Sequence, residues 1–121
     1  VLKTMMKKKK GSIINISSNA AFERDVGRSA YASSKLSLIA LTQVLSKEFA
    51  KFNIRVNSIS PGLTKTRMMD DVSDKVKEEV IKKIPLGRVA DPKDIANAAL
   101  FLASGESDYI TGENLNITGG Y

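Results

Sequence analysis

The sequence contains no cysteine, no histidine and no tryptophan among its 121 residues. The absence of cysteine excludes disulfide bonds and thiolate chemistry, and the absence of histidine removes the commonest metal ligand and general base. No apolar run is long enough to span a membrane, and residues 1–10 lack the apolar stretch of a signal peptide. These absences favour a cytoplasmic protein that has no metal site.

Positive charge is in excess, with 19 lysine and arginine residues against 13 acidic ones, and four consecutive lysines occupy residues 7–10. We interpret this run as the end of a helix, because cations complement the negative end of the helix dipole and the following Gly11 favours termination. No aromatic residue is interleaved with the lysines, which argues against nucleic-acid binding. A docking patch for an acidic protein is the remaining interpretation.

Short apolar runs alternate with segments of helical periodicity. "SIINIS" (12–17), "IRVNSIS" (54–60) and "NLNIT" (114–118) are predicted strands, and Pro61-Gly62 ends the second of them. Residues 29–52 carry apolar side chains at spacings of three and four, which predicts an amphipathic helix. The residues expected on its inward face are Leu38, Leu41, Leu45, Phe49 and Phe52.

Two further helices are predicted in the second half of the chain. Residues 73–84 form a short helix, with Val76, Val80 and Ile84 expected to face inward. Asp91 precedes Pro92, with Asp94 in the same first turn, which predicts the start of a helix that stops at Gly105. The order strand, helix, strand, helix, helix, strand predicts an α/β fold with a parallel sheet.

Three polar residues suggest a chemistry. Ser18 follows the first predicted strand, where open α/β sheets place their ligand sites, and Tyr31 and Lys35 face the same side of the next helix. A tyrosine ordinarily keeps its proton up to about pH 10, but a nearby ammonium favours the phenolate. The trio therefore suits proton exchange with a carbonyl or carbinol oxygen, while a nicotinamide cofactor carries the hydride. Taken singly, such a Tyr–Lys pair is more often an exposed helix pair, and such a serine more often a helix cap.

Four separated segments resemble the short-chain dehydrogenase/reductase family, in the family's order and spacing. They are "GSIINISS", "YASSK", "RVNSISPGLTKT" and "IPLGRVADPKDIANAALFLASGESDYITGENLNITGG". The resemblance covers the whole chain and implies the C-terminal half of a Rossmann-like doubly wound parallel sheet, with three strands and flanking helices. Residues 1–121 are accordingly expected to be the C-terminal portion of a single reductase domain, without its N-terminal cofactor-binding half. The family's glycine-rich phosphate turn, "TGxxxGxG", does not occur in the sequence, so we expect the 121-residue chain alone to be inactive.

The resemblance also implies roles for the three polar residues. Ser18 orients the substrate carbonyl and Tyr31 donates the proton. Lys35 favours the phenolate form of Tyr31, and both residues take part in binding the cofactor, Lys35 through the nicotinamide ribose.

The segment "PGLTKT" resembles the family's loop around the nicotinamide. Pro61 and Gly62 shape its turn, Thr64 lies where the backbone meets the carboxamide, and Thr66 matches a polar family position. Asn57 matches a recurrent asparagine, which we interpret as a loop-fixing residue rather than a catalytic one.

Within the family, the chain most resembles the 3-oxoacyl-acyl-carrier-protein reductases of fatty acid biosynthesis. The implied function is NAD(P)-dependent interconversion of a carbonyl and an alcohol, with NADPH as the expected cofactor and NADH as the alternative. Lys9 falls in the basic cluster where such reductases contact their acidic carrier, whereas a second basic position falls at Phe52, beside Lys51.

Other functions stay open at this point. Sugar and polyol dehydrogenases of the same family share much of this half, and a non-catalytic α/β assembly module is a further alternative. The expected partners are a small-molecule or carrier-bound carbonyl substrate and further copies of the chain, in a homodimer or homotetramer. Helix 29–52 and the C-terminal strand are the implied contacts, and neither nucleic acid nor membrane is expected.

Overall fold

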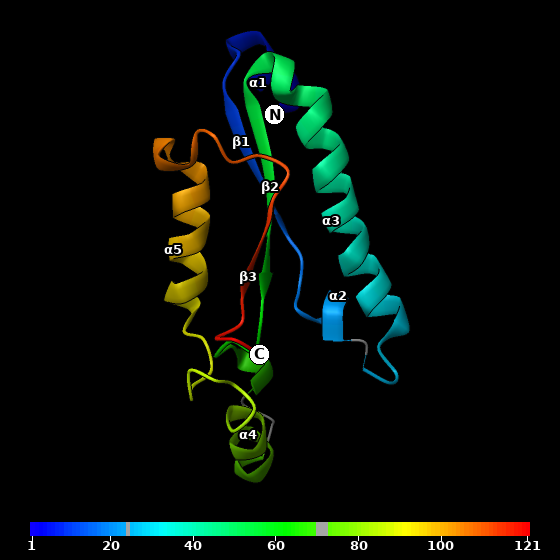
Figure 1. The fold of residues 1–121 in the computed structure, drawn as a ribbon, viewed down its shortest axis with the longest axis vertical. Coiled ribbons are helices and arrows are strands. Elements are labelled where there is room, and N and C mark those ends of the chain that lie inside the picture. Colours follow the sequence, from blue (N-terminus) through cyan, green and yellow to red (C-terminus); the bar gives the residue numbers. More distant parts are fainter. Residues whose placement is uncertain (24, 70–72) are drawn as a thin grey trace.

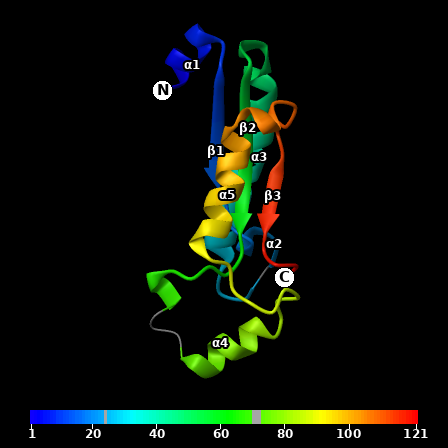
Figure 2. The same cartoon turned by 90° about the vertical axis from the view of Figure 1, so that its left-hand side faces the viewer.

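A three-stranded parallel sheet forms the centre of the molecule. The computed structural model describes residues 1–23, 25–69 and 73–121. Its sheet has the order β1-β2-β3, where β1 is Gly11–Ile16, β2 is Ile54–Pro61 and β3 is Asn114–Ile117. Ile16 pairs with Ile59, and Pro61 with Ile117, so the carboxyl ends of the strands meet at one end of the sheet (Figure 2). The prediction of parallel α/β structure is confirmed.

Helices cover both faces of this sheet. Figure 1 shows α3 on one face and α5 on the other, which gives three layers. The helices are α1 (Leu2–Lys8), α2 (Ala20–Glu23), α3 (Ser29–Phe49), α4 (Asp74–Ile81) and α5 (Pro92–Ala103), with 3-10 turns η1 (Ala50–Phe52), η2 (Arg67–Met69) and η3 (Gly105–Ser107). In the part of the chain that the structure describes, no helix has the length and apolar character needed to cross a membrane.

The start of α5 follows from local chemistry, as predicted. The Asp91 side chain accepts a hydrogen bond from the backbone N–H of Lys93, and the Asp94 side chain accepts one from the backbone N–H of Asp91. These two bonds form a capping box, and Pro92 occupies the first helical position. At the other end of α5, the guanidinium of Arg55 on β2 donates to the carbonyls of Leu102 and Ser104. The helix is therefore fixed to the central strand.

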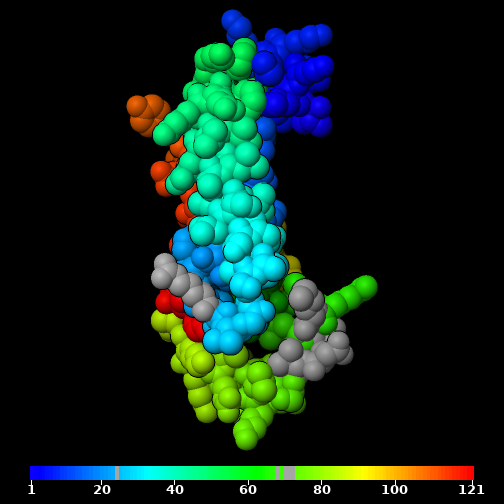
Figure 3. All heavy atoms as spheres, turned by 90° about the vertical axis from the view of Figure 1, so that its right-hand side faces the viewer, coloured from blue at the N-terminus to red at the C-terminus, as the bar shows by residue number. Residues whose placement is uncertain are grey.

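The inward faces of two helices differ from the predictions. On α3 the buried residues are Ile39, Thr42 and Ser46, whereas Leu41 is 46% exposed, because it lies on the face turned away from the sheet. Figure 3 shows α3 covering this side of the molecule with its outer face open. On α4, Val76 is 47% exposed. This helix lies beyond the carboxyl ends of the strands, where no sheet covers it (Figure 2).

Candidate active site

The segment that follows β1 lies beside the carboxyl-terminal end of β2. The backbone N–H of Ser17 donates to the carbonyl of Ile59 over 2.8 Å, and the backbone N–H of Asn19 donates to the carbonyl of Pro61 over 2.9 Å. Ser18 lies between these two bonds. The residues before and after Ser18 are therefore both hydrogen-bonded to β2. Ser18 thus has a fixed backbone position at the end of the sheet where ligands of α/β proteins bind.

Ser18 begins the turn into α2. Its Oγ accepts a hydrogen bond from the backbone N–H of Ala20 over 3.2 Å, and its carbonyl accepts one from the backbone N–H of Ala21 over 3.1 Å. Among the residues that the structure describes, the hydroxyl proton of Ser18 has no acceptor. The half-buried hydroxyl can therefore donate to a substrate oxygen.

Tyr31 and Lys35 lie together in the first two turns of α3. The Nζ atom of Lys35 is 5.8 Å from the centroid of the Tyr31 ring, and it donates to the backbone carbonyl of Ile16 over 3.1 Å. Tyr31 is 49% exposed, so its phenol is accessible to a ligand. The structure thus brings the ammonium of Lys35 next to both the phenol ring and the end of β1, two residues before Ser18.

The loop after β2 is held by close backbone packing. The N–H of Gly62 donates to the carbonyl of Ile117 over 2.9 Å, and a Cβ atom on Gly62 would lie only 3.0 Å from the Cα of Thr118. Thr64 forms a bridge with Ala90, and its hydroxyl donates to the carbonyl of Gly62 over 3.0 Å. The close approach of the two chain segments explains the glycine, independently of any ligand.

Pro61 and Thr66 mark the two ends of this loop. Pro61 is the last residue of β2, and its carbonyl accepts the hydrogen bond from Asn19. Thr66 is exposed and directly precedes η2, and its carbonyl accepts a hydrogen bond from the N–H of Met69, the last residue of η2. The loop thus starts beside Ser18 and runs outward from the sheet.

These groups fit one end of a nicotinamide cofactor. Lys35 offers ammonium protons to ribose hydroxyls, and residues 61–66 offer backbone and hydroxyl groups at the same end of the sheet. The sequence offers no comparable binding site for the diphosphate of the cofactor, because it lacks a glycine-rich turn that precedes a helix. The residues present therefore fit the nicotinamide and its ribose only.

A charged pair lies beside the far side of this loop. The guanidinium of Arg88 contacts both carboxylate oxygens of Asp94, at 2.7 and 3.3 Å. This hydrogen bonding holds the pKa of Asp94 below its ordinary value, and the N–H of Asp91 lowers it further; the same pair raises the pKa of Arg88. A cavity of about 170 Å³ adjoins the pair, lined by Leu86, Arg88, Ala90, Asp94, Ile117, Thr118 and Gly119. Since each charge is matched by the other, we interpret the pair as part of the fold.

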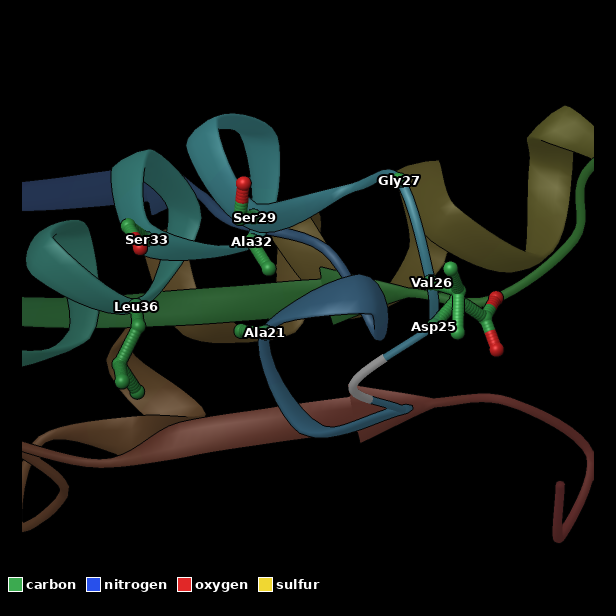
Figure 4. A pocket seen from close by; sticks show the side chains of 8 residues that line it. All are labelled: Ala21, Asp25, Val26, Gly27, Ser29, Ala32, Ser33 and Leu36. Carbon is green, nitrogen blue, oxygen red and sulfur yellow. The ribbon is translucent and has the colours of Figure 1, made fainter.

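A second cavity, of about 420 Å³, lies between α2 and the start of α3 (Figure 4). It is lined by Ala21, Asp25, Val26, Gly27, Ser29, Ala32, Ser33 and Leu36. None of the predicted catalytic residues lines it. Its walls are mostly small or apolar side chains, so it adjoins the site without supplying reactive groups.

Two buried polar residues near the site were not singled out from the sequence. The hydroxyl of Ser17 donates to the backbone carbonyl of Lys35 over 2.8 Å, and the amide of Asn19 donates to the carboxylate of Glu23 over 2.8 Å. The only signal for them in the sequence is a run of polar residues at a strand end, "SSN". Asn57, by contrast, bonds to the carbonyl of Ile110 and the N–H of Glu113, as expected of a loop-fixing residue.

Comparison with known sequences identifies the family to which the chain is similar. A family profile described as "Enoyl-(Acyl carrier protein) reductase" matches residues 1–121. The 3-oxoacyl-acyl-carrier-protein reductase FabG of Chlamydia muridarum (strain MoPn / Nigg) is 47% identical over 120 residues, which cover 99% of this chain and 48% of that relative. The chain thus spans about half the length of the curated relatives it matches.

Solved structures give the same result. A putative 2-deoxy-d-gluconate 3-dehydrogenase from Agrobacterium tumefaciens, with bound NADP, matches with a TM-score of 0.92 and 34% identity, over 98% of this chain and 50% of that one. A 3-oxoacyl-acyl-carrier-protein reductase from Brucella melitensis, with bound NAD, matches with a TM-score of 0.86 and 31% identity, over 98% of this chain and 44% of that one. The fold and the matches together define a Rossmann-like α/β protein. The chain belongs to the short-chain dehydrogenase/reductase family.

Proposed function

We propose that the complete protein is an NAD(P)-dependent oxidoreductase that reduces the carbonyl of a 3-oxoacyl group carried on acyl carrier protein, with NADPH as the reductant. One observation carries the proposal. Lys35 joins the end of β1, where Ser18 lies, to the phenol ring of Tyr31. This contact supports a site in which the hydroxyl of Ser18, the phenol of Tyr31 and the ammonium of Lys35 act together at the carboxyl ends of the strands.

The chemistry follows from these three groups. The hydroxyl of Ser18 donates a hydrogen bond to the substrate carbonyl and orients it, while keeping its own proton. Tyr31 gives its phenol proton to the same oxygen as the alcohol forms, and the ammonium of Lys35 stabilises the phenolate that remains. A bound nicotinamide supplies the hydride to the carbonyl carbon. In the reverse direction the phenolate of Tyr31 accepts the proton of the alcohol.

The cofactor would contact the same end of the sheet. Lys35, with Tyr31 beside it, would hold the nicotinamide ribose, and the loop formed by Pro61, Gly62, Thr64 and Thr66 would enclose the nicotinamide. We assign the diphosphate to a segment outside this chain and propose that residues 1–121 are the C-terminal portion of a single Rossmann-fold domain. The half-length match to the relatives supports this division.

Replacement of Tyr31 tests the reaction. In the full-length gene product, Tyr31→Phe should lower turnover by about 10²–10⁴-fold, because it removes the general acid and leaves the ring in place. The matched control is Tyr109→Phe, since Tyr109 is a fully exposed tyrosine outside the site. The assay follows oxidation of NADPH by acetoacetyl-carrier protein. Turnover by a folded Tyr31→Phe protein equal to that of the wild type would exclude Tyr31 as the proton donor.

The substrate class is tested separately. Lys9 follows the last residue of α1 and Lys51 lies in η1, and both sites are at the amino end of the strands, away from Ser18 (Figure 1). This positive end suits an acidic carrier protein, so salt should weaken the reaction with carrier-bound substrate more than the reaction with a small ketone. The match to a sugar dehydrogenase favours a second candidate, oxidation of a sugar or polyol. A higher kcat/KM for a sugar acid than for the acyl carrier substrate would select that candidate.

We also propose a cytoplasmic homodimer or homotetramer. Leu41 and Val44 are exposed on the outer face of α3, and Leu100 and Leu115 are exposed on α5 and β3. Apolar side chains gathered on a surface are typical of a contact with another chain. Closed two-fold assemblies are the commonest way to cover such surfaces.

A further inference from the structure

Two consecutive residues at the end of β1 hold Lys35. The hydroxyl of Ser17 donates to the backbone carbonyl of Lys35 over 2.8 Å, and the carbonyl of Ile16 accepts from its Nζ atom over 3.1 Å. Ser17 is only 3% exposed, and its own N–H donates to the carbonyl of Ile59 on the central strand. The residue that holds the backbone of Lys35 is therefore itself fixed to the sheet.

We propose that Ser17 is a positioning residue, which sets the place of Lys35 and Tyr31 relative to Ser18. Ser17 precedes Ser18 directly in the chain, and Tyr31 lies one helical turn before Lys35. The side-chain hydrogen bond of Ser17 thus connects the segment that carries the hydroxyl donor, directly after β1, to the helix that carries the phenol and the ammonium. The inference rests on the proposed function, and Ser17 acts in it only through Lys35.

The side chain of Lys35 adds to this argument. In a parallel ladder, consecutive residues direct their backbone groups to opposite sides of the strand. Because the N–H of Ser17 points to β2, the carbonyl of Ile16 points to the outer edge of β1, and there it meets the Nζ atom of Lys35. Lys35 therefore crosses the end of β1, with its backbone held by Ser17 and its ammonium at the edge, close to the ring of Tyr31.

A second hydrogen bond between the same strand and helix provides a matched control. The amide of Asn15 donates to the hydroxyl of Thr42 over 2.8 Å, and Thr42 is completely buried. Thr42 lies seven residues after Lys35, or about 10 Å along the helix axis. Thr42→Val removes this bond with little change in shape. It weakens the attachment of α3 to β1 away from the reacting groups.

Ser17→Ala removes the hydrogen bond at Lys35 and keeps nearly the same volume. We expect kcat to fall by roughly 10- to 100-fold, because a misplacement of about 1 Å can cost 10²-fold. The KM for the carbonyl substrate should change little, since Ser17 does not touch it. The pH–rate profile of alcohol oxidation should move to higher pH, because a displaced ammonium favours the phenolate less. Thr42→Val should leave kcat and the pH profile as in the wild type.

The experiment combines kinetics with amide hydrogen exchange on the full-length gene product. Kinetics use NADPH with acetoacetyl-carrier protein, and exchange is followed by NMR at residues 31–36 and 40–46. Ser17→Ala should speed exchange at residues 31–36, and Thr42→Val only at residues 40–46. A Ser17→Ala protein with wild-type kcat and pH profile, or with unchanged exchange at residues 31–36, overturns the inference. A wild-type protein that reduces no carbonyl overturns the proposed function instead, and the exchange data then still decide whether Ser17 fixes this turn of α3.

Discussion

Replacement of Asn57 tests whether this buried amide belongs to the fold or to the reaction. Asn57 lies in the middle of β2 and is completely buried. Its Nδ2 donates to the carbonyl of Ile110 over 2.9 Å, and its Oδ1 accepts from the N–H of Glu113 over 3.1 Å. Both partners lie in the turn that connects η3 to β3. The amide therefore holds this turn against the central strand.

The cost of removing the amide follows from these two bonds. Asn57→Ala leaves the carbonyl of Ile110 and the N–H of Glu113 without their partner, and each unsatisfied buried group costs about 1–3 kcal/mol. The turn is partly open to solvent and can relax, so we expect the free energy of unfolding to fall by about 2–4 kcal/mol. Urea unfolding measures this loss. A loss smaller than about 0.5 kcal/mol, the usual range for a surface substitution, would refute the structural role.

Asn57→Asp gives the same prediction a pH dependence. The substitution keeps the acceptor for Glu113 but turns a carboxylate oxygen toward the carbonyl of Ile110. Burial and this contact raise the pKa of the introduced carboxyl in the folded state. The loss of stability should therefore be complete above that raised pKa and should diminish as the pH falls toward the unfolded pKa of about 3.9, since the protonated acid can donate to Ile110. Asn97→Asp, on the exposed face of α5, is the control. Equal losses for Asn57→Asp near pH 7 and pH 5 would contradict this reasoning.

Three further predictions concern charge and assembly. Lys35→Met should move the pH–rate profile of alcohol oxidation to higher pH and weaken cofactor binding; an unchanged profile would mean that Lys35 does not act on Tyr31. Asp94→Asn should lower the melting temperature near neutral pH. The variant should also lose less stability than the wild type when the pH is lowered into the acid range. The reason is that Arg88 lowers the pKa of Asp94, so this stabilisation is present above the ordinary carboxyl pKa of about 4 and is lost as the pH falls through the lowered value. Light scattering should give a mass above that of one chain, and Val44→Lys should reduce it; a single-chain mass for the wild type would contradict the predicted contact on α3.

Most elements could be predicted because their signals are local. The helix start at Asp91 needs only a capping carboxylate, a proline and Asp94 in the first turn. In the structure both carboxylates accept the expected hydrogen bonds, and Pro92 occupies the first helical position. The inward face of α3 was predicted less well. Spacings of three and four are compatible with two neighbouring faces of a helix. The prediction places Leu41 on the inward face, whereas it lies on the outer face of α3. Small and polar residues, Thr42 among them, fill the face that meets β2, so hydrophobicity alone could not identify it.

The candidate site likewise combines contacts that are local in the sequence with contacts between distant residues. The closeness of Tyr31 and Lys35 is encoded by their spacing on one helix, so the sequence alone predicts it. The bond between Ser17 and Lys35 joins residues 18 positions apart, through the packing of a helix on a strand end. No periodicity encodes such a bond, and a serine at a strand end has many other uses. In the proposed mechanism, this contact sets how far Ser18 lies from the phenol and the ammonium. Because proton transfer depends on that separation, the residues that set the geometry of such a site are harder to find in a sequence than the residues that react.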